Sequence, residues 1–125
     1  MFVHGYGLSA VRLLQRGLRS TDENGESLLT KSVDEGFDVW IVSTRGTSYS
    51  NEHEFLDPQS REYWSFSFSE IGSQDIKAAV DVIYNDNGQR KIYLIGQSNG
   101  TTANHYAMST PLEEEFFAER VHKVI

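Results

Sequence analysis

The chain has 125 residues, a formal net charge of −7 and no cysteine. This length is enough for one domain, and the absence of cysteine excludes disulfides, thiolate metal sites and a cysteine nucleophile. The acidic balance argues against a nucleic-acid partner, because phosphate binding requires a basic face. No apolar run approaches the ~18 residues of a transmembrane segment, and the first residues show no signal-peptide pattern.

Apolar runs and helical patterns alternate along the chain. In chain order, the sequence predicts a strand at 1–3, a helix at 10–20, a loop at 21–25, a helix at 26–35, a strand at 37–42, a long packed loop at 45–69, a helix at 73–84, a strand at 92–95, a helix at 99–108 and a strand at 121–125. The strand runs are continuously apolar, which is typical of a parallel sheet covered on both faces. The alternation therefore predicts an α/β fold with right-handed crossovers.

The strongest chemical signal is Gly96-Gln97-Ser98-Asn99-Gly100, a G-x-S-x-G pattern between a predicted strand and a predicted helix. In a nucleophile elbow, this turn lifts the serine hydroxyl above the sheet, and the glycines let the helix approach the strand closely. The alternative is a chance turn, but the flanking strand and helix favour the functional interpretation. We therefore expect Ser98 to be a nucleophile, with Gly96, Gln97 and Gly100 forming its elbow.

A second signal is His4-Gly5, directly after the first predicted strand. In folds with a nucleophile elbow of this kind, two backbone N–H groups stabilise the negatively charged oxygen that forms during the reaction. One comes from the loop after that strand and the other from the residue after the nucleophile. The candidates are the backbone N–H groups of Tyr6 and Asn99, with His4 and Gly5 supporting the loop. A plain strand-to-loop turn is the alternative for His4-Gly5, and the elbow favours the oxyanion role.

The two signals above belong to a longer series of segments whose order along the chain is the same as in a known protein family. They are His4-Gly5, Gly36-Phe37-Asp38-Val39-Trp40, Ser43-Thr44-Arg45-Gly46-Thr47-Ser48-Tyr49-Ser50, Asp57-Pro58, Tyr63-Trp64-Ser65-Phe66-Ser67-Phe68-Ser69-Glu70-Ile71, Asp75 and the elbow with Thr101-Thr102. With these segments the chain resembles the acid lipases, the gastric and lysosomal group of α/β-hydrolases. The resemblance covers most of the chain and is weakest over 8–32.

The resemblance implies an α/β-hydrolase fold with a central parallel sheet and flanking helices, present as its N-terminal half in one partial domain, 1–125. It implies hydrolysis of lipid esters, such as acylglycerols or sterol esters, in lipid catabolism, without a metal or organic cofactor. The implied partners are a lipid ester substrate and a lipid–water interface. The family is mostly secreted or lysosomal.

The chain departs from the family in three ways. Gln97 and Asn99 stand where the family usually has His and Gln, and Tyr6 replaces an aliphatic residue. The family's triad runs Ser, Asp, His, yet no Asp follows Ser98. His105 lies about 10 Å along the predicted helix, too far to accept the Ser98 proton. We therefore expect the acid and the base outside these residues, and this chain alone to be inactive.

Two other functions remain open at this point. One is a carboxylesterase for small soluble esters, which a preference for short acyl chains would indicate. The other is a truncated, non-catalytic fragment, in which a serine-reactive phosphonate would not label Ser98.

Four features have structural interpretations. His53 lacks a second ligand at metal-binding spacing, the aromatic residues at 63–68 pack under the loop or form an acyl-binding wall, Arg45 holds the loop, and Asp75 belongs to a helix N-terminal turn.

Overall fold

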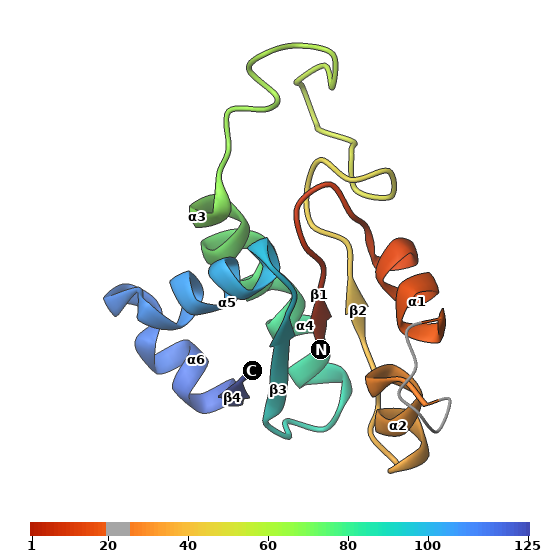
Figure 1. Ribbon diagram of the computed structural model, residues 1–125. Helices are drawn as coiled ribbons and strands as arrows, with labels where there is room; N and C mark the ends of the chain where they lie inside the picture. The colour runs from red at the N-terminus through yellow and green to blue at the C-terminus, as the bar shows by residue number, and fades with distance from the viewer. Residues whose placement is uncertain (20–25) are drawn as a thin grey trace.

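Four parallel strands form the centre of the molecule (Figure 1). The computed structural model describes residues 1–19 and 26–125, so the loop predicted at 21–25 lies outside the described residues. The strands are β1 (Phe2–Val3), β2 (Ile41–Val42), β3 (Ile92–Gly96) and β4 (Val121–Val124), in the sheet order β2-β1-β3-β4. The α/β fold predicted from the alternating pattern is confirmed.

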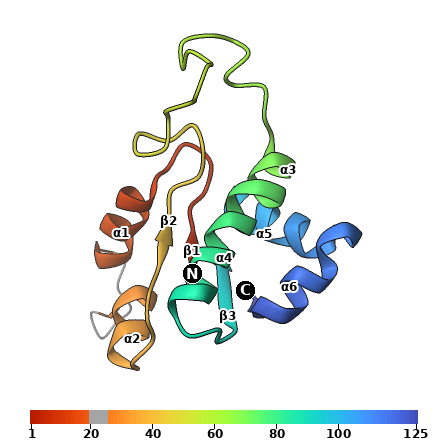
Figure 2. The same ribbon diagram turned by 180° about the vertical axis from the view of Figure 1, so that it is seen from behind.

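Helical segments connect each strand to the next. They are α1 (Ala10–Arg19) and α2 (Leu28–Asp34), then α3 (Phe68–Glu70), the π-helical η1 (Ile71–Ile76) and α4 (Lys77–Asp86), and finally α5 (Asn99–Ser109), the 3₁₀-helical η2 (Pro111–Glu113) and α6 (Glu114–Arg120). In Figures 1 and 2, α1 and α2 lie beside β2, at the opposite end of the molecule from α5 and α6.

The strand order places a crevice between β1 and β3. From the central β1 the chain first runs to β2 on one side and then returns to β3 on the other. Connections that diverge in this way leave an opening at the carboxyl ends of the two strands, where open α/β sheets bind ligands. Val3 pairs with Gly96 in this register. The residues after them, His4 and Gln97, therefore emerge side by side.

The hydrophobic core lies on one face of the sheet. Val3 and Leu94 are fully buried there, together with Ile76 and Val80 of the helix after β2 and Phe117 of α6. The helical stripe predicted at 73–84 thus faces the core, as its spacing indicated.

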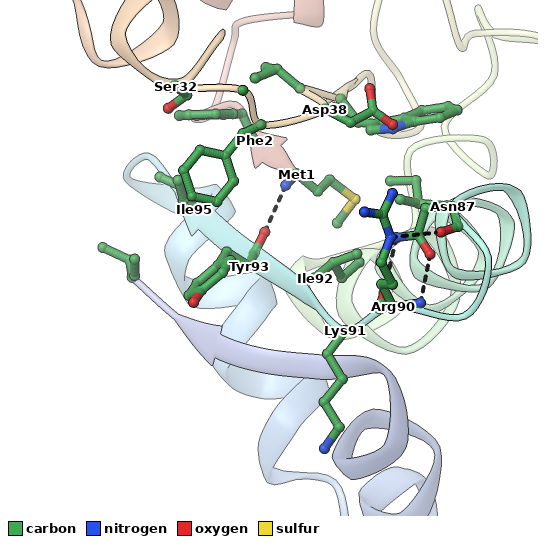
Figure 3. Close-up of a pocket in the computed structure, with 16 residues that line it drawn as sticks. Met1, Phe2, Ser32, Asp38, Asn87, Arg90, Lys91, Ile92, Tyr93 and Ile95 are labelled. Atoms are coloured by element: carbon green, nitrogen blue, oxygen red, sulfur yellow. Dashed lines mark hydrogen bonds between the residues drawn. The ribbon is translucent and has the colours of Figure 1, made fainter. Parts of the chain in front are cut away.

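The prediction that both faces of the sheet are covered is wrong for the described residues. Tyr93 is 37% exposed, Phe37 56% and Ile125 57%. Figure 3 shows Phe2, Tyr93 and Ile95 on this second face, where they line a pocket of about 560 Å³. The reason is that α4, α5 and α6 contribute to the core on the Val3 and Leu94 side, whereas α1 lies against β2 and α2.

Two predicted boundaries also differ from the structure by more than two residues. The strand predicted at 37–42 is only Ile41–Val42, because β1 offers just Phe2 and Val3 for pairing. The helix predicted at 73–84 begins at Phe68 and ends at Asp86. Its start is set by a capping box, in which the Ser67 hydroxyl accepts from a backbone N–H and Glu70 accepts from the Ser67 N–H at 2.7 Å.

Candidate active site

Ser98 sits in the turn between β3 and α5 with a strained backbone. Its φ is 52° and its ψ is −117°, and in the described residues Gln89 is the only other non-glycine residue with positive φ. Such a conformation costs free energy and persists where the surrounding structure enforces it. The side chain is exposed. This geometry is typical of a nucleophile elbow, which carries its serine on a sharp strand-to-helix turn.

The two flanking glycines allow the tight packing of the turn. A Cβ at Gly96 would lie 2.5 Å from the Thr101 backbone nitrogen. A Cβ at Gly100 would lie 2.5 Å from the Val3 carbonyl oxygen and 2.6 Å from that of His4. Any larger residue at either position would push α5 away from the sheet. The two glycines of the G-x-S-x-G pattern thus allow α5 to lie close to β1 and β3.

His4 is buried, and both of its ring nitrogens are engaged. Its Nδ1–H donates to the Gly5 carbonyl oxygen at 2.9 Å, and its Nε2 accepts from the Thr44 backbone N–H at 3.2 Å. Because a backbone N–H can only donate, Nε2 carries no proton and the tautomer is fixed. His4 therefore supports the loop after β1 and is not positioned to accept a proton from Ser98.

The loop after β1 lies directly against the elbow. A Cβ at Gly5 would lie 3.1 Å from the Ser98 Cβ and 3.7 Å from its hydroxyl oxygen. Tyr6 and Asn99 both line a cleft of about 820 Å³ beside Ser98. The structure thus brings together the five elbow residues and the His4–Tyr6 segment at the crevice between β1 and β3.

Aromatic side chains form one wall of this cleft. Trp64, Phe66 and Phe68 line it, and Trp64 and Phe68 are 53% and 43% exposed. Tyr63 is buried and packs edge-on against Trp64 and Phe66. The predicted packing of these aromatic residues is confirmed for Tyr63, and the acyl-binding wall stays a prediction.

No histidine–carboxylate pair reaches Ser98 in the described residues. His105 is exposed on α5, and the ring of His122 on β4 packs against Tyr93 at 4.9 Å. His53 accepts from the Phe55 and Leu56 backbone N–H groups. Among the residues that the structure describes, no group of three or more His, Cys, Asp or Glu side chains is arranged to hold a metal ion.

The pocket in Figure 3 is separate from this site. It is lined on one side by Phe2, Tyr93 and Ile95 and on the other by residues such as Met1, Asn87 and Arg90, with none of the predicted site residues among them. The predicted site residues His4, Gly5, Tyr6, Asn99 and Gly100 line the other cleft, at the carboxyl ends of β1 and β3.

Comparison with known proteins identifies the family. The sequence matches no protein-family model. It is 37% identical over 110 residues to gastric triacylglycerol lipase of Bos taurus, an alignment that covers 83% of this chain and 28% of that protein. It is 36% identical over 109 residues to lysosomal acid lipase/cholesteryl ester hydrolase of Homo sapiens, covering 82% and 27%. Lipase member M of Mus musculus is 36% identical over 124 residues, covering 94% and 28%.

This chain belongs to the acid lipase family. The resemblance predicted from the series of segments between His4-Gly5 and Thr101-Thr102 is confirmed, and the fold is that of the α/β-hydrolases. The chain spans less than a third of the length of these acid lipases. In its described part, no helix has both the length and the apolar character needed to cross a bilayer.

One ion pair near the cleft of this acid lipase chain is not marked by any pattern in its sequence. Arg45 holds its loop as predicted, but its partner is Asp75, whose Oδ1 lies 2.6 Å from Arg45 Nη2. Asp75 is not in a helix N-terminal turn, because the helical segment begins seven residues earlier at Phe68. The capping signature Ser67-x-x-Glu70 was present in the sequence and marks that earlier start.

Proposed function

We propose that this chain acts in the hydrolysis of lipid carboxylic esters, with Ser98 as the nucleophile. The observation that carries the proposal is the strained Ser98 backbone in the turn before α5, in contact distance of Gly5. An unfavourable backbone conformation that exposes a hydroxyl at the ligand-binding edge of a sheet is best explained by chemistry at that hydroxyl. Membership of the acid lipase family supports the same assignment.

The proposed reaction proceeds through an acyl-enzyme. Ser98 Oγ attacks the acyl carbonyl while a histidine takes the hydroxyl proton, and the carbonyl oxygen becomes an oxyanion. The Tyr6 and Asn99 N–H groups stabilise that charge. The histidine then protonates the departing alcohol. Water next attacks the acyl carbonyl while the histidine takes its proton, and the histidine returns that proton to Ser98 Oγ as the fatty acid leaves.

The histidine and its orienting Asp are proposed to lie outside residues 1–125. His4 uses both ring nitrogens for Gly5 and Thr44, and neither His105 nor His122 contacts Ser98 within the described residues. An unassisted serine hydroxyl is a weak nucleophile. The 125-residue chain alone is therefore proposed to be inactive.

The lining of the cleft supports the proposal that an acyl chain binds beside Ser98. Trp64, Phe66 and Phe68 offer apolar surface next to Asn99 and Gly100, which suits the hydrocarbon part of an acylglycerol or sterol ester. The names of the relatives specify triacylglycerol and cholesteryl esters. A carboxylesterase for small soluble esters is the competing assignment.

The test is ester hydrolysis by the full natural chain that contains these residues. Ser98→Ala is expected to lower kcat by about 10⁴-fold or more, as for other serine nucleophiles. Ser109→Ala, on the same helix with its hydroxyl bonded to Tyr106, is the matched control and keeps full activity. Activity that survives Ser98→Ala would refute the nucleophile, and a preference for short acyl chains would refute the lipase assignment.

A further inference from the structure

An ion pair joins the loop after β2 to the helical segment that follows it. Asp75 accepts the Arg45 backbone N–H at 2.8 Å through Oδ2 and the Arg45 Nε–H at 2.8 Å through Oδ1. Arg45 also donates from Nη2 to Gln74 at 2.7 Å. The Asp75 side chain is 14% exposed. Charge-assisted bonds in such a partly shielded place hold geometry better than a surface ion pair does.

This pair is connected to the loop after β1 through two residues, Thr44 and His4. Thr44, the neighbour of Arg45, donates its backbone N–H to His4 Nε2 at 3.2 Å, and its hydroxyl lies 3.3 Å from the same nitrogen. Thr44 and His4 are both buried. The opposite ring nitrogen of His4 donates to the Gly5 carbonyl oxygen. A continuous path of bonds thus runs from Asp75 to Gly5.

The last bond in this path sets the direction of a proposed catalytic donor. The Gly5 carbonyl and the Tyr6 N–H belong to one planar trans peptide, so they point in opposite directions. The Gly5 oxygen accepts from His4 at 2.9 Å and from the Leu8 backbone N–H at 3.2 Å, so His4 is the shorter of the two bonds that fix where the Tyr6 N–H points. An oxyanion donor is effective only when it is aimed in advance at the position where the charge develops.

Asp75 lies in the π-helical turn η1, which touches both the cleft and the core. Ile71 at the start of η1 lines the cleft, and Ile76 at its end is fully buried in the core. Asp75, the residue before Ile76, accepts from Arg45. One short segment thus contacts the cleft, the core and the loop after β2. π-Turns occur frequently at functional sites.

We propose that Asp75 and Arg45 are positioning residues that fix His4 and thereby the direction of the Tyr6 N–H. The catalytic consequence rests on the proposed function, whereas the link to His4 does not. Loss of the pair loosens Thr44, so His4 releases the Gly5 carbonyl more often. The expected effect is on the transition state and not on substrate binding, because the oxyanion forms only during the reaction.

The experiment compares Asp75→Asn with Asp81→Asn in the full natural chain. Asp81 also pairs with an arginine, Arg120, in the same helical region but away from the cleft, so it is a matched control. Two quantities are measured. The first is kcat and KM on an ester substrate, and the second is the solvent exchange rate of the His4 Nδ1–H, followed by ¹⁵N NMR.

In Asp75→Asn, kcat is expected to fall about 10- to 100-fold with KM within about twofold, and the His4 Nδ1–H to exchange about tenfold faster. Asp81→Asn changes neither quantity. Faster exchange in a chain that hydrolyses no ester would support the positioning link and refute the proposed function. Unchanged exchange in Asp75→Asn would overturn the inference, whatever the activity.

A second variant covers the case in which Asp75→Asn does not fold. Arg45→Gln keeps the backbone N–H that donates to Asp75 and removes the side-chain bonds. Its effects are expected to be smaller, about threefold in kcat and in His4 exchange, because part of the link remains. Exchange at the wild-type rate in Arg45→Gln would overturn the inference.

Discussion

At the scale of single residues, Gly100 is the position where α5 meets β1. Replacing it with Ala places a Cβ 2.5 Å from the Val3 carbonyl oxygen, which is backbone and cannot move aside alone. We expect Gly100→Ala to lower the free energy of unfolding by about 1–3 kcal/mol, as overpacking does. Urea denaturation measures this change. Thr102→Ala, at an exposed position on the same helix, is the control, and an equal loss in both variants would contradict the packing argument.

Asn104 on α5 lowers the stability of the fold, because its side chain is polar and buried. It is fully buried, and within the described residues neither its Nδ2 nor its Oδ1 has a hydrogen-bond partner. A buried polar group without a partner is destabilising, whereas an apolar side chain of similar shape is not. We expect Asn104→Leu to raise the free energy of unfolding by about 1 kcal/mol, and Asn104→Asp to lower it.

Thermal and urea unfolding of the two Asn104 variants check this expectation. A loss of stability in Asn104→Leu would mean that the amide has a partner beyond the contacts of the described residues, such as a buried water, and would contradict the account of an unsatisfied group.

At the scale of elements, the capping box before α3 makes stability depend on pH. The Ser67 backbone N–H, followed by the Ser67 hydroxyl, lowers the pKa of Glu70 from 4.5 to about 2. Because the folded-state pKa is the lower one, this contribution is fully present above pH 4.5. It is lost as the pH falls from there to about 2.

We therefore expect Glu70→Gln to be less stable than the wild type near neutral pH, and the difference to shrink as the pH falls through this window. Unfolding curves recorded at several pH values between 6 and about 2 measure the difference. A difference that stays constant over the whole range would contradict a role for the Glu70 carboxylate.

The elements that the sequence predicted best depend on local patterns. The helical stripe in 73–84 and the G-x-S-x-G turn are both written in consecutive residues, and the structure has a helix and a sharp turn there. The length of β2 depends instead on how much of β1 is available for pairing. The Arg45–Asp75 pair joins residues 30 apart, and no periodicity marks such a contact.

In the candidate site, too, some features follow from consecutive residues and others only from contacts between distant residues. The residues of the elbow and the His4–Tyr6 segment follow from motif and order, while their contact follows from the register that pairs Val3 with Gly96. The role of His4 was predicted only as loop support. The bonds to Thr44 and Gly5 that define this support required the three-dimensional arrangement.

At the scale of the whole molecule, one face of the sheet presents exposed apolar side chains, including Phe37 and Tyr93, which pack edge-on at 6.1 Å. Exposed apolar patches promote association. We expect the 125-residue chain to self-associate, and Phe37→Lys to reduce this, as measured by light scattering. Leu112→Lys, at an isolated and highly exposed position, is the control. Equal effects of both variants would contradict a role for this face.

If Ser98 is the nucleophile of a lipid ester hydrolase, as proposed, it reacts with a fluorophosphonate. The probe is applied to the full natural chain and the adduct is mapped by peptide mass spectrometry. We expect one adduct, on Ser98, and none on the isolated 125-residue chain, in which no base contacts Ser98 among the described residues. An adduct on another serine, or ester hydrolysis by a full chain whose Ser98 stays unlabelled, would contradict it.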